Sequence, residues 1–283
     1  MTREGKGRGE RRPKRSLGQN FLVDRNLAGR IVEEVRVAPG ETVLEIGPGR
    51  GALTEGLAAE VARAGGRLVL VELDDHLARG LEETYGERED VTVLHRDVLT
   101  VDPGEVTPDP ASLKVVGNIP YNVTSPILFH LLTPPRPREI LIMVQKEVAD
   151  RLLAEPGTGE YGALTVGVRS VAQVEAVLRV PPGAFRPRPR VDSRVVRITP
   201  WDPPPLGRDA EGRLRELTRA LFQWRRKQLG KILRDHPDLS LDPDAVAAVL
   251  AAGGARATDR PENVSPRGFI AMAAALPPRG RSR

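Results

Sequence analysis

The segment VLEIGPGRGALT, residues 43–54, constrains the fold more than any other part of the chain. An aliphatic run typical of a buried strand leads into a loop that contains Gly47, Gly49 and Gly51, and a helix-forming segment follows. Glycine lets the backbone turn tightly and approach a ligand closely, beneath the N-terminus of the following helix. This order of elements predicts an α/β protein with a nucleotide-binding loop at one edge of its sheet.

Short apolar runs continue to alternate with helical segments through the first 200 residues. We expect strands at residues 42–47, 67–72, 91–95, 113–117 and 139–145, helices at 51–64 and 75–85, an apolar segment at 126–132, and two further strands at 175–180 and 193–199 that close the sheet. Strands that are apolar throughout indicate a parallel sheet covered on both faces. The prediction is therefore a Rossmann-like, doubly wound domain.

Four prolines in PWDPPPLG, residues 200–207, interrupt this alternation, and sequence with a helical period follows them. The expected organisation is a disordered basic arm at 1–15, an α/β domain at 16–200, a small all-helical C-terminal domain at 208–276 and a basic tail at 277–283. No internal repeat is evident.

Composition excludes several classes of protein. The chain has no cysteine, which excludes disulfides and thiol nucleophiles, and its four histidines lack metal-ligand spacing, so we expect no metal site. No Walker lysine follows the glycine loop, and there is no GxSxG nucleophile motif. No apolar run is long enough to span a membrane, and the basic N-terminus has no apolar stretch behind it, so we expect a cytoplasmic protein.

The positive charge is concentrated in two places. Residues 1–15 hold seven Lys/Arg against two Glu, which equals the net charge of +5 of the whole chain. Residues 211–234 hold eight Lys/Arg against two Glu. A basic arm and a basic helical segment are typical of a protein that binds a polyanion such as nucleic acid, although a solvated helix face has the same composition.

Two acidic residues that follow later strands narrow the choice of ligand for this loop. The loop reads GxGxG, with Ala52 where a dinucleotide-binding loop has its third glycine. Glu72 ends the next expected strand and can accept hydrogen bonds from both hydroxyls of a ribose, and Asp97 follows the strand after it and can accept from an adenine amino group. The three features together favour S-adenosyl-L-methionine (AdoMet) as the cofactor.

The segment NIPY, residues 118–121, follows the fourth expected strand and should lie beside the cofactor. The Asn118 side-chain oxygen can accept from an exocyclic base amine, Pro120 fixes the backbone, and Tyr121 offers a ring on which a flipped-out base can stack. We expect a direct in-line methyl transfer that depends on orientation and fixed dipoles and needs no strong base.

With these motifs in place, the chain resembles the ribosomal small-subunit RNA adenine dimethyltransferase family (the KsgA type). The resemblance rests on KRSLGQNFLVDRNLAGRIV (14–32), VLEIGPGRGALT, NIPYNVTSPILF, MVQKEVADRLLAEPGTGEYGALTV (143–166) and PPGAFRPRPRVDSRVV (181–196) in the same order, and more loosely on LFQWRRKQLGKIL (221–233). It implies a class I AdoMet-dependent methyltransferase that dimethylates N6 of two adjacent adenosines near the 3′ end of 16S rRNA in the assembling small subunit.

The resemblance also implies roles for individual residues. Gln19, Asn20 and Leu22 would close over AdoMet, Gly47 and Gly49 would line its methionine portion, Glu72 and Asp97 would bind ribose and adenine, and Asn118 would lie between cofactor and target, with Phe185 stacking on the target adenine opposite Tyr121. The arginines Arg186, Arg188 and Arg190 and the RRK segment, Arg225, Arg226 and Lys227, would contact RNA. Trp224 before the RRK and Gln228 after it depart from the family pattern.

Other readings remain open at this point. One is a 23S rRNA adenine N6-methyltransferase of the macrolide-resistance type, which shares the glycine loop and a similar NIPYN block. Another is a catalytically silent ribosome-assembly or transcription factor on the same fold, and a third is a DNA or protein-glutamine methyltransferase. Nothing in the sequence requires more than a monomer.

Overall fold

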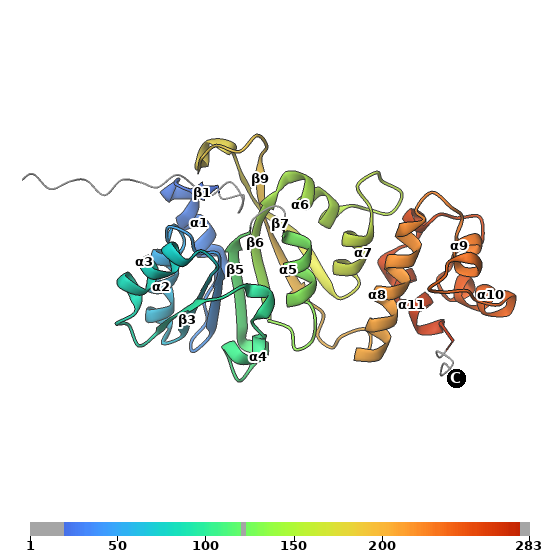
Figure 1. The fold of residues 1–283 in the computed structure, drawn as a ribbon, viewed down its shortest axis with the longest axis horizontal. Helices are drawn as coiled ribbons and strands as arrows, with labels where there is room; N and C mark the ends of the chain where they lie inside the picture. The colour runs from blue at the N-terminus through green and yellow to red at the C-terminus, as the bar shows by residue number, and fades with distance from the viewer. Residues whose placement is uncertain (1–19, 120–122, 278–283) are drawn as a thin grey trace, which may run out of the picture.

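The structure of the protein, a computed structural model, describes residues 20–119 and 123–277 (Figure 1). The predicted basic arm, Gln19, Pro120, Tyr121 and most of the basic tail lie outside the described residues.

The described residues contain one seven-stranded sheet with the strand order β4-β3-β2-β5-β6-β9-β7. Its strands are β2 (Thr42–Ile46), β3 (Arg67–Glu72), β4 (Val91–His95), β5 (Leu113–Asn118), β6 (Glu139–Gln145), β7 (Ala172–Val180) and β9 (Ser193–Pro200). Strands β4 to β6 pair in parallel, whereas β9 runs antiparallel to both β6 and β7. The prediction of a Rossmann-like sheet is confirmed.

Helices cover both faces of this sheet because successive strand side chains point in opposite directions. Leu44 and Ile46 of β2 belong to a core cluster with residues of α5 (Thr124–Leu131), α6 (Lys146–Leu153) and α7 (Ala163–Arg169). Val43 of the same strand belongs to a second cluster with residues of α1 (Arg25–Val35), α2 (Thr54–Ala64) and α3 (Asp75–Tyr85). A short helix α4 (Pro103–Val106) lies between β4 and β5 in the chain.

A two-residue strand near the N-terminus reaches a distant part of the chain. β1 (Phe21–Leu22) pairs antiparallel with β8 (Phe185–Arg186), and the Val23 amide donates to the Ala184 carbonyl over 2.8 Å. We call these two paired segments the β1–β8 ribbon. Leu22 and Phe185 are both buried in the cluster that contains α1 and α2, so side-chain packing holds the ribbon against the domain.

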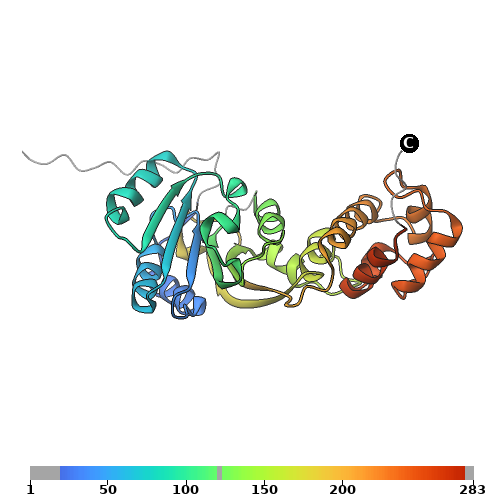
Figure 2. The same cartoon turned by 90° about the horizontal axis from the view of Figure 1, so that it is seen from below.

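The chain beyond the proline-rich linker is helical. It contains α8 (Arg208–Gln223), α9 (Leu229–Asp235), α10 (Pro243–Ala252) and α11 (Pro266–Ala275), which lie at the opposite end of the molecule from α1–α3 (Figures 1 and 2). Their core cluster also includes Tyr161, whose hydroxyl donates to the Val264 carbonyl over 2.6 Å. Tyr161 precedes the linker in the sequence, yet it packs in the core of the C-terminal helices. The limits of the two domains predicted from the sequence therefore remain a prediction.

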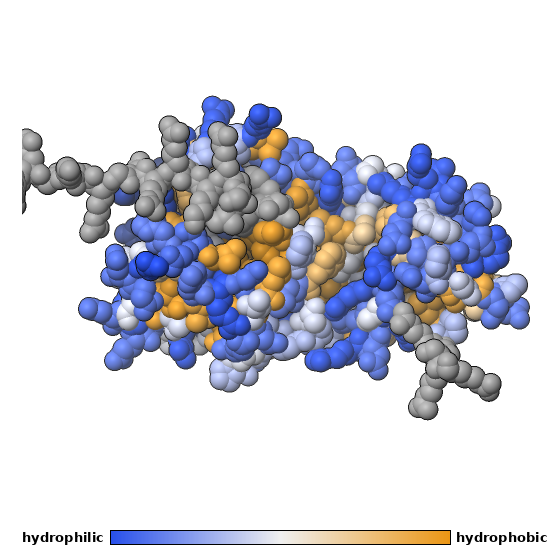
Figure 3. Space-filling model, viewed as in Figure 1, coloured by the Kyte–Doolittle hydropathy of each residue, from blue (hydrophilic) through white to orange (hydrophobic). Residues whose placement is uncertain are grey.

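The surface of the molecule is uneven in polarity. Hydrophobic residues gather in the middle of the face shown in Figure 3, around α5, while the surface of the C-terminal helices on that face is mostly hydrophilic.

A buried ion pair between Arg136 and Glu211 joins the loop after α5 to α8. No helix in the part of the chain that the structure describes is long and apolar enough to cross a membrane.

Candidate active site

The parallel register brings the predicted cofactor residues to one edge of the sheet. Ile46, at the end of β2, is paired with Val71 of β3 on one side and Gly117 of β5 on the other. Gly47, Glu72 and Asn118 therefore lie at the carboxyl ends of three adjacent strands. In a doubly wound sheet this edge is where ligands bind.

The glycine loop has a backbone that other residues adopt only with strain. Gly47 and Gly49 have φ values of +63° and +60°. A Cβ on Gly49 would also lie 3.2 Å from the ring of Phe21, which is tighter than an ordinary van der Waals contact. Glycine is therefore required at position 49 both for its conformation and for the close approach of a neighbouring side chain.

Glu72 fastens this loop to the end of β3. Its Oε2 accepts from the Gly49 amide over 3.0 Å, and its Oε1 accepts from the Asp74 amide over 2.8 Å. Burial raises the pKa of Glu72, and these two backbone hydrogen bonds oppose the rise. Each carboxylate oxygen can accept a second hydrogen bond, so the two hydroxyls of a ribose can still be bound.

Asn118 is held by the N-terminal segment. Its Nδ2 donates to the Asn20 carbonyl over 2.9 Å, which fixes the orientation of the side-chain amide. Within residues 20–119 and 123–277 the Oδ1 atom has no hydrogen-bond partner, so it can accept a hydrogen bond from another molecule. The role of Asn118 Oδ1 as the acceptor for a base amine stays a prediction.

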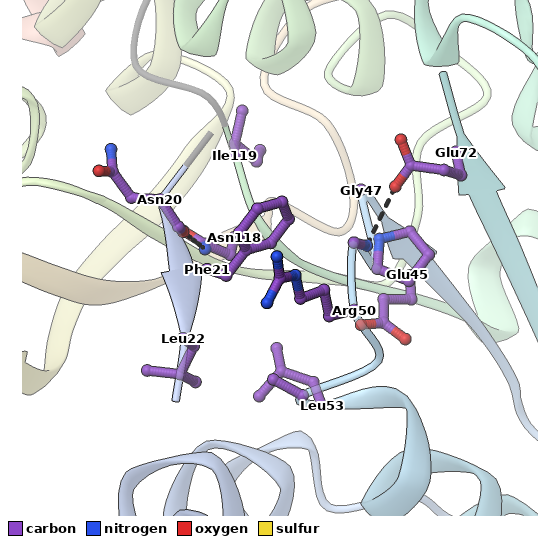
Figure 4. A pocket seen from close by; sticks show the side chains of 13 residues that line it. Asn20, Phe21, Leu22, Glu45, Gly47, Arg50, Leu53, Glu72, Asn118 and Ile119 are labelled. Atoms are coloured by element: carbon purple, nitrogen blue, oxygen red, sulfur yellow. Dashed lines mark hydrogen bonds between the residues drawn. The ribbon is translucent and has the colours of Figure 1, made fainter. Parts of the chain in front are cut away.

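These residues surround a cavity of about 80 Å³ (Figure 4). It is lined by Asn20, Phe21, Leu22, Glu45, Gly47, Pro48, Gly49, Arg50, Ala52, Leu53, Glu72, Asn118 and Ile119. The Phe21 ring lies over the glycine loop, with the Arg50 guanidinium carbon 4.8 Å from its centroid. Small-molecule sites usually enclose about 300 Å³ or more, so this cavity is smaller than a nucleotide-sized ligand requires, and Phe21 is one of the side chains that narrow it.

Glu45 is a residue of this cavity that the sequence prediction missed. Its side chain is 2% exposed, and its Oε2 has no hydrogen-bond partner in the structure as described. Burial raises the pKa of Glu45 to about 8, and the nearby Thr54 hydroxyl opposes this rise only in part. Thr54 Oγ1 is buried too and has no hydrogen-bond partner among the described residues. The available signal was a lone acid inside an otherwise apolar strand. A buried, unpartnered carboxylate in a ligand cavity can bind a cationic group.

The predicted adenine-binding acid lies outside the cavity around the glycine loop. Asp97 follows β4 and caps the 3₁₀ helix η2 (Val98–Thr100), accepting from the Leu99 amide over 2.9 Å. Asp97 does not line the cavity around the glycine loop. Leu73 follows Glu72 and Leu99 lies two residues after Asp97, and both are exposed, at 53% and 37%.

The residues predicted to bind the target differ in their exposure. The Phe185 side chain is fully buried beneath the ribbon, so its ring does not face solvent in this structure. Arg186 donates to the Phe185 carbonyl over 2.9 Å, whereas the exposed Arg188 and Arg190 have no partner among the described residues.

The RRK segment forms the turn between α8 and α9. Arg225 donates to Glu262 over 2.7 Å and to the Gly159 carbonyl over 3.0 Å, so it ties this turn to two other loops. Arg226 and Lys227 are exposed and have no ion-pair partner within the described ranges. Of the three RNA contacts predicted in this segment, Arg226 and Lys227 are therefore the two whose charges are available to bind phosphate.

The fold and the site together define a class I, AdoMet-dependent methyltransferase. The sequence profile of the ribosomal RNA adenine dimethylase family matches residues 10–238. The chain belongs to this family.

Individual relatives agree with this assignment. The protein named ribosomal RNA small subunit methyltransferase A of Maridesulfovibrio salexigens is 41% identical over 262 residues, which cover 92% of this chain and 94% of that protein. The protein of the same name from Geobacillus kaustophilus is 39% identical over 271 residues, covering 94% and 91%. The family, enzyme class and cofactor predicted from the sequence are confirmed.

Two solved structures resemble the chain over most of its length. The 23S rRNA methyltransferase ErmE is 31% identical with a TM-score of 0.67, covering 91% of this chain and 99% of that one. A dimethyladenosine transferase from Plasmodium falciparum shares the fold with a TM-score of 0.71 at 22% identity, covering 89% and 95%. The fold therefore extends through the C-terminal helices.

Proposed function

We propose that this enzyme transfers methyl groups from AdoMet to N6 of two adjacent adenosines near the 3′ end of 16S rRNA, giving dimethyladenosine at both. The single observation that carries the proposal is the Asn118 amide, held by Asn20 at the edge where the glycine loop and Glu72 meet. Its substrate is the assembling small ribosomal subunit in the cytoplasm, and it acts as a monomer.

The residues present fit AdoMet. The glycine loop accommodates the methionine portion, Glu72 the ribose hydroxyls, and Asp97 with Leu73 and Leu99 the adenine. Glu45, whose Oε2 has no hydrogen-bond partner among the described residues, suits the amino group of the methionine portion. Asn20 and Leu22 line the cavity from the N-terminal side, and we expect Gln19, which lies outside the described residues, to close it with them.

The chain contributes orientation to the chemistry. Bound AdoMet supplies an electrophilic methyl carbon, and the adenine N6 forms the new bond while the sulfur–carbon bond breaks. Asn118 Oδ1 accepts from one N–H of the amine and keeps the nitrogen lone pair directed at the methyl group. The other N–H proton leaves to solvent. In the second round Asn118 can accept from the one N–H that remains until the new bond forms, after which this proton also leaves to solvent.

The target adenine has to reach Asn118 Oδ1 from the side of the site where the RNA binds. As predicted from the sequence, we expect Tyr121 to offer a stacking face to the base and Pro120 to restrict the backbone between Asn118 and Tyr121. Stacking on Phe185 requires the ribbon to open, because that ring is buried. Arg186, Arg188 and Arg190 then contact phosphates near the target, and Arg226 and Lys227 of the RRK segment contact phosphates elsewhere on the RNA.

Methylation of 23S rRNA is the alternative, and the 31% identity to ErmE is the observation in its favour. The higher identity of 39–41% to small-subunit methyltransferases favours 16S rRNA. Incubating the protein and AdoMet with under-methylated small subunits, and separately with 23S rRNA, then mapping methylated adenosines, tests the choice. Label confined to 23S rRNA contradicts the proposal, and label in neither RNA points to a silent assembly factor.

A further inference from the structure

The turn between α8 and α9 borders a hollow that the active site does not use. It has a volume of about 290 Å³ and is lined by Gln223, Trp224, Arg225, Arg226, Lys227 and Lys231. Trp224 is one of only two tryptophans in the chain. An aromatic ring surrounded by cations is the combination that binds single-stranded nucleic acid.

The indole is held firmly from behind. The Trp224 ring packs on His236 with centroids 5.0 Å apart and planes tilted by 58°. His236 is only 3% exposed; its Nε2 lies 2.9 Å from Gln223 Oε1, and its Nδ1 accepts from the Asp238 amide over 3.2 Å. A ring that is already ordered costs little entropy when a ligand stacks on it.

The positively charged side chains around the hollow differ in whether they already bind a carboxylate or a carbonyl. Arg225 is tied to Glu262 and the Gly159 carbonyl, and Lys231 pairs with Asp235 over 2.7 Å. Arg226 and Lys227 have no ion-pair partner among the residues that the structure describes. Two exposed positive charges next to the ring are therefore available to phosphates.

We propose that this hollow binds one unpaired nucleotide of the substrate RNA, with its base stacked on Trp224 and its flanking phosphates against Arg226 and Lys227. This inference rests on the proposed RNA substrate and adds a base-stacking subsite to it. Figure 1 shows the turn on the same side of the molecule as the carboxyl ends of the parallel strands. An RNA whose adenosine enters the active site can therefore reach it along one face.

A fluorescence titration of the full chain tests stacking directly. The Trp201→Phe variant leaves Trp224 as its only indole, and the Trp224→Phe variant leaves only the 44% exposed Trp201 as a matched control. A single-stranded oligoribonucleotide should quench the first variant strongly and the second weakly. Equal quenching by a blunt RNA duplex, or by an oligoglutamate of the same charge, overturns the proposal, since neither presents an unpaired base.

Affinity and salt dependence separate stacking from charge. Trp224→Leu should weaken binding of the oligoribonucleotide about 5- to 150-fold, the range measured for loss of one base–aromatic stack, without changing the salt slope. Trp224→Tyr should keep most of the affinity, which shows that loss in the leucine variant is not misfolding. Replacing Arg226 and Lys227 with alanine should reduce the slope by about 1.4 for single-stranded RNA.

Two outcomes separate a failure of the stacking subsite from a failure of the proposed function. If Trp224→Leu binds the oligoribonucleotide as tightly as the parent while small-subunit RNA is still methylated, only the subsite is wrong. If stacking is seen and no RNA is methylated, the subsite stands and the proposed reaction is wrong.

Discussion

Replacing Glu45 with glutamine should remove a large part of the pH dependence of stability in the ligand-free protein. The Glu45 carboxyl is fully enclosed, and burial raises its pKa to about 8 from an ordinary value of 4.5. The folded protein consequently holds a proton between these pH values that the unfolded chain has released. The free energy of unfolding must then fall as the pH rises through this window.

The size of the effect follows from the two pKa values. Each pKa unit corresponds to about 1.4 kcal/mol, so the charged carboxylate costs about 5 kcal/mol of stability above pH 8 relative to below pH 4.5. For a chain of this size the loss amounts to roughly 10–20 °C in Tm. Hydrogen bonds from arginines lower the pKa values of Glu34 and Asp90, so these groups stabilise the fold as the pH rises through the acid range.

Thermal unfolding of the two proteins between pH 5.5 and 9 isolates the contribution of Glu45. The parent should lose stability relative to Glu45→Gln as the pH rises, because glutamine cannot ionise. Glu55→Gln, an exposed change on α2, is the matched control and should follow the parent at every pH. A Tm difference between parent and Glu45→Gln that stays constant over this range refutes the idea that Glu45 is protonated in the free protein.

The cofactor should reverse this protonation. A bound cation beside Oε2 favours the charged carboxylate, so binding near pH 7 should release a proton in the parent and none in Glu45→Gln. Calorimetric titration with the reaction product in two buffers of different ionisation enthalpy measures this release. Equal proton release in both proteins contradicts a contact between Glu45 and the ligand.

Five further substitutions test the site and the surface. Asn118→Ala should abolish methyl transfer yet cost only about 1 kcal/mol of stability for its hydrogen bond to the Asn20 carbonyl, as measured by tritiated AdoMet and thermal unfolding. Gly49→Ala should weaken AdoMet binding in calorimetry, since the new methyl group would strain a φ of +60°. Phe185→Ala should lower stability by about 3–5 kcal/mol because the ring is fully buried, and a loss below 1 kcal/mol would mean it is exposed in solution. Arg225→Ala should lower Tm, whereas Arg226→Ala should leave Tm unchanged and reduce the salt slope of RNA binding by about 0.7 for single strands.

Local sequence pattern was sufficient for most of the sheet. The strands predicted at 67–72, 91–95 and 139–145 have those same limits in the structure, since each is an apolar run bounded by polar or turn-forming residues. The helix predicted at 75–85 is also found with those limits, capped by the Asp74 side chain. The direction of β9 was not predicted, because alternation of side chains is the same in parallel and antiparallel strands.

The candidate site was predicted where its residues follow strands and missed where burial decides their state. Gly47, Glu72 and Asn118 come together because parallel strands end at one edge. Glu45 lies inside a strand, and only the packed structure shows that its carboxyl is enclosed and that its Oε2 lacks a hydrogen-bond partner among the described residues. The burial of Phe185 depends on a pairing with Leu22 across more than 160 residues of chain, which no local pattern encodes.

That pairing connects the two halves of the proposed reaction. In the β1–β8 ribbon, Phe21 lies over the glycine loop and Arg186 begins the arginine-bearing segment. A two-residue pairing makes too few backbone hydrogen bonds to be stable alone, so burial of Leu22 and Phe185 must fix its position. A ligand that displaces Phe21 therefore acts on the same short strand that supports the predicted RNA-binding arginines.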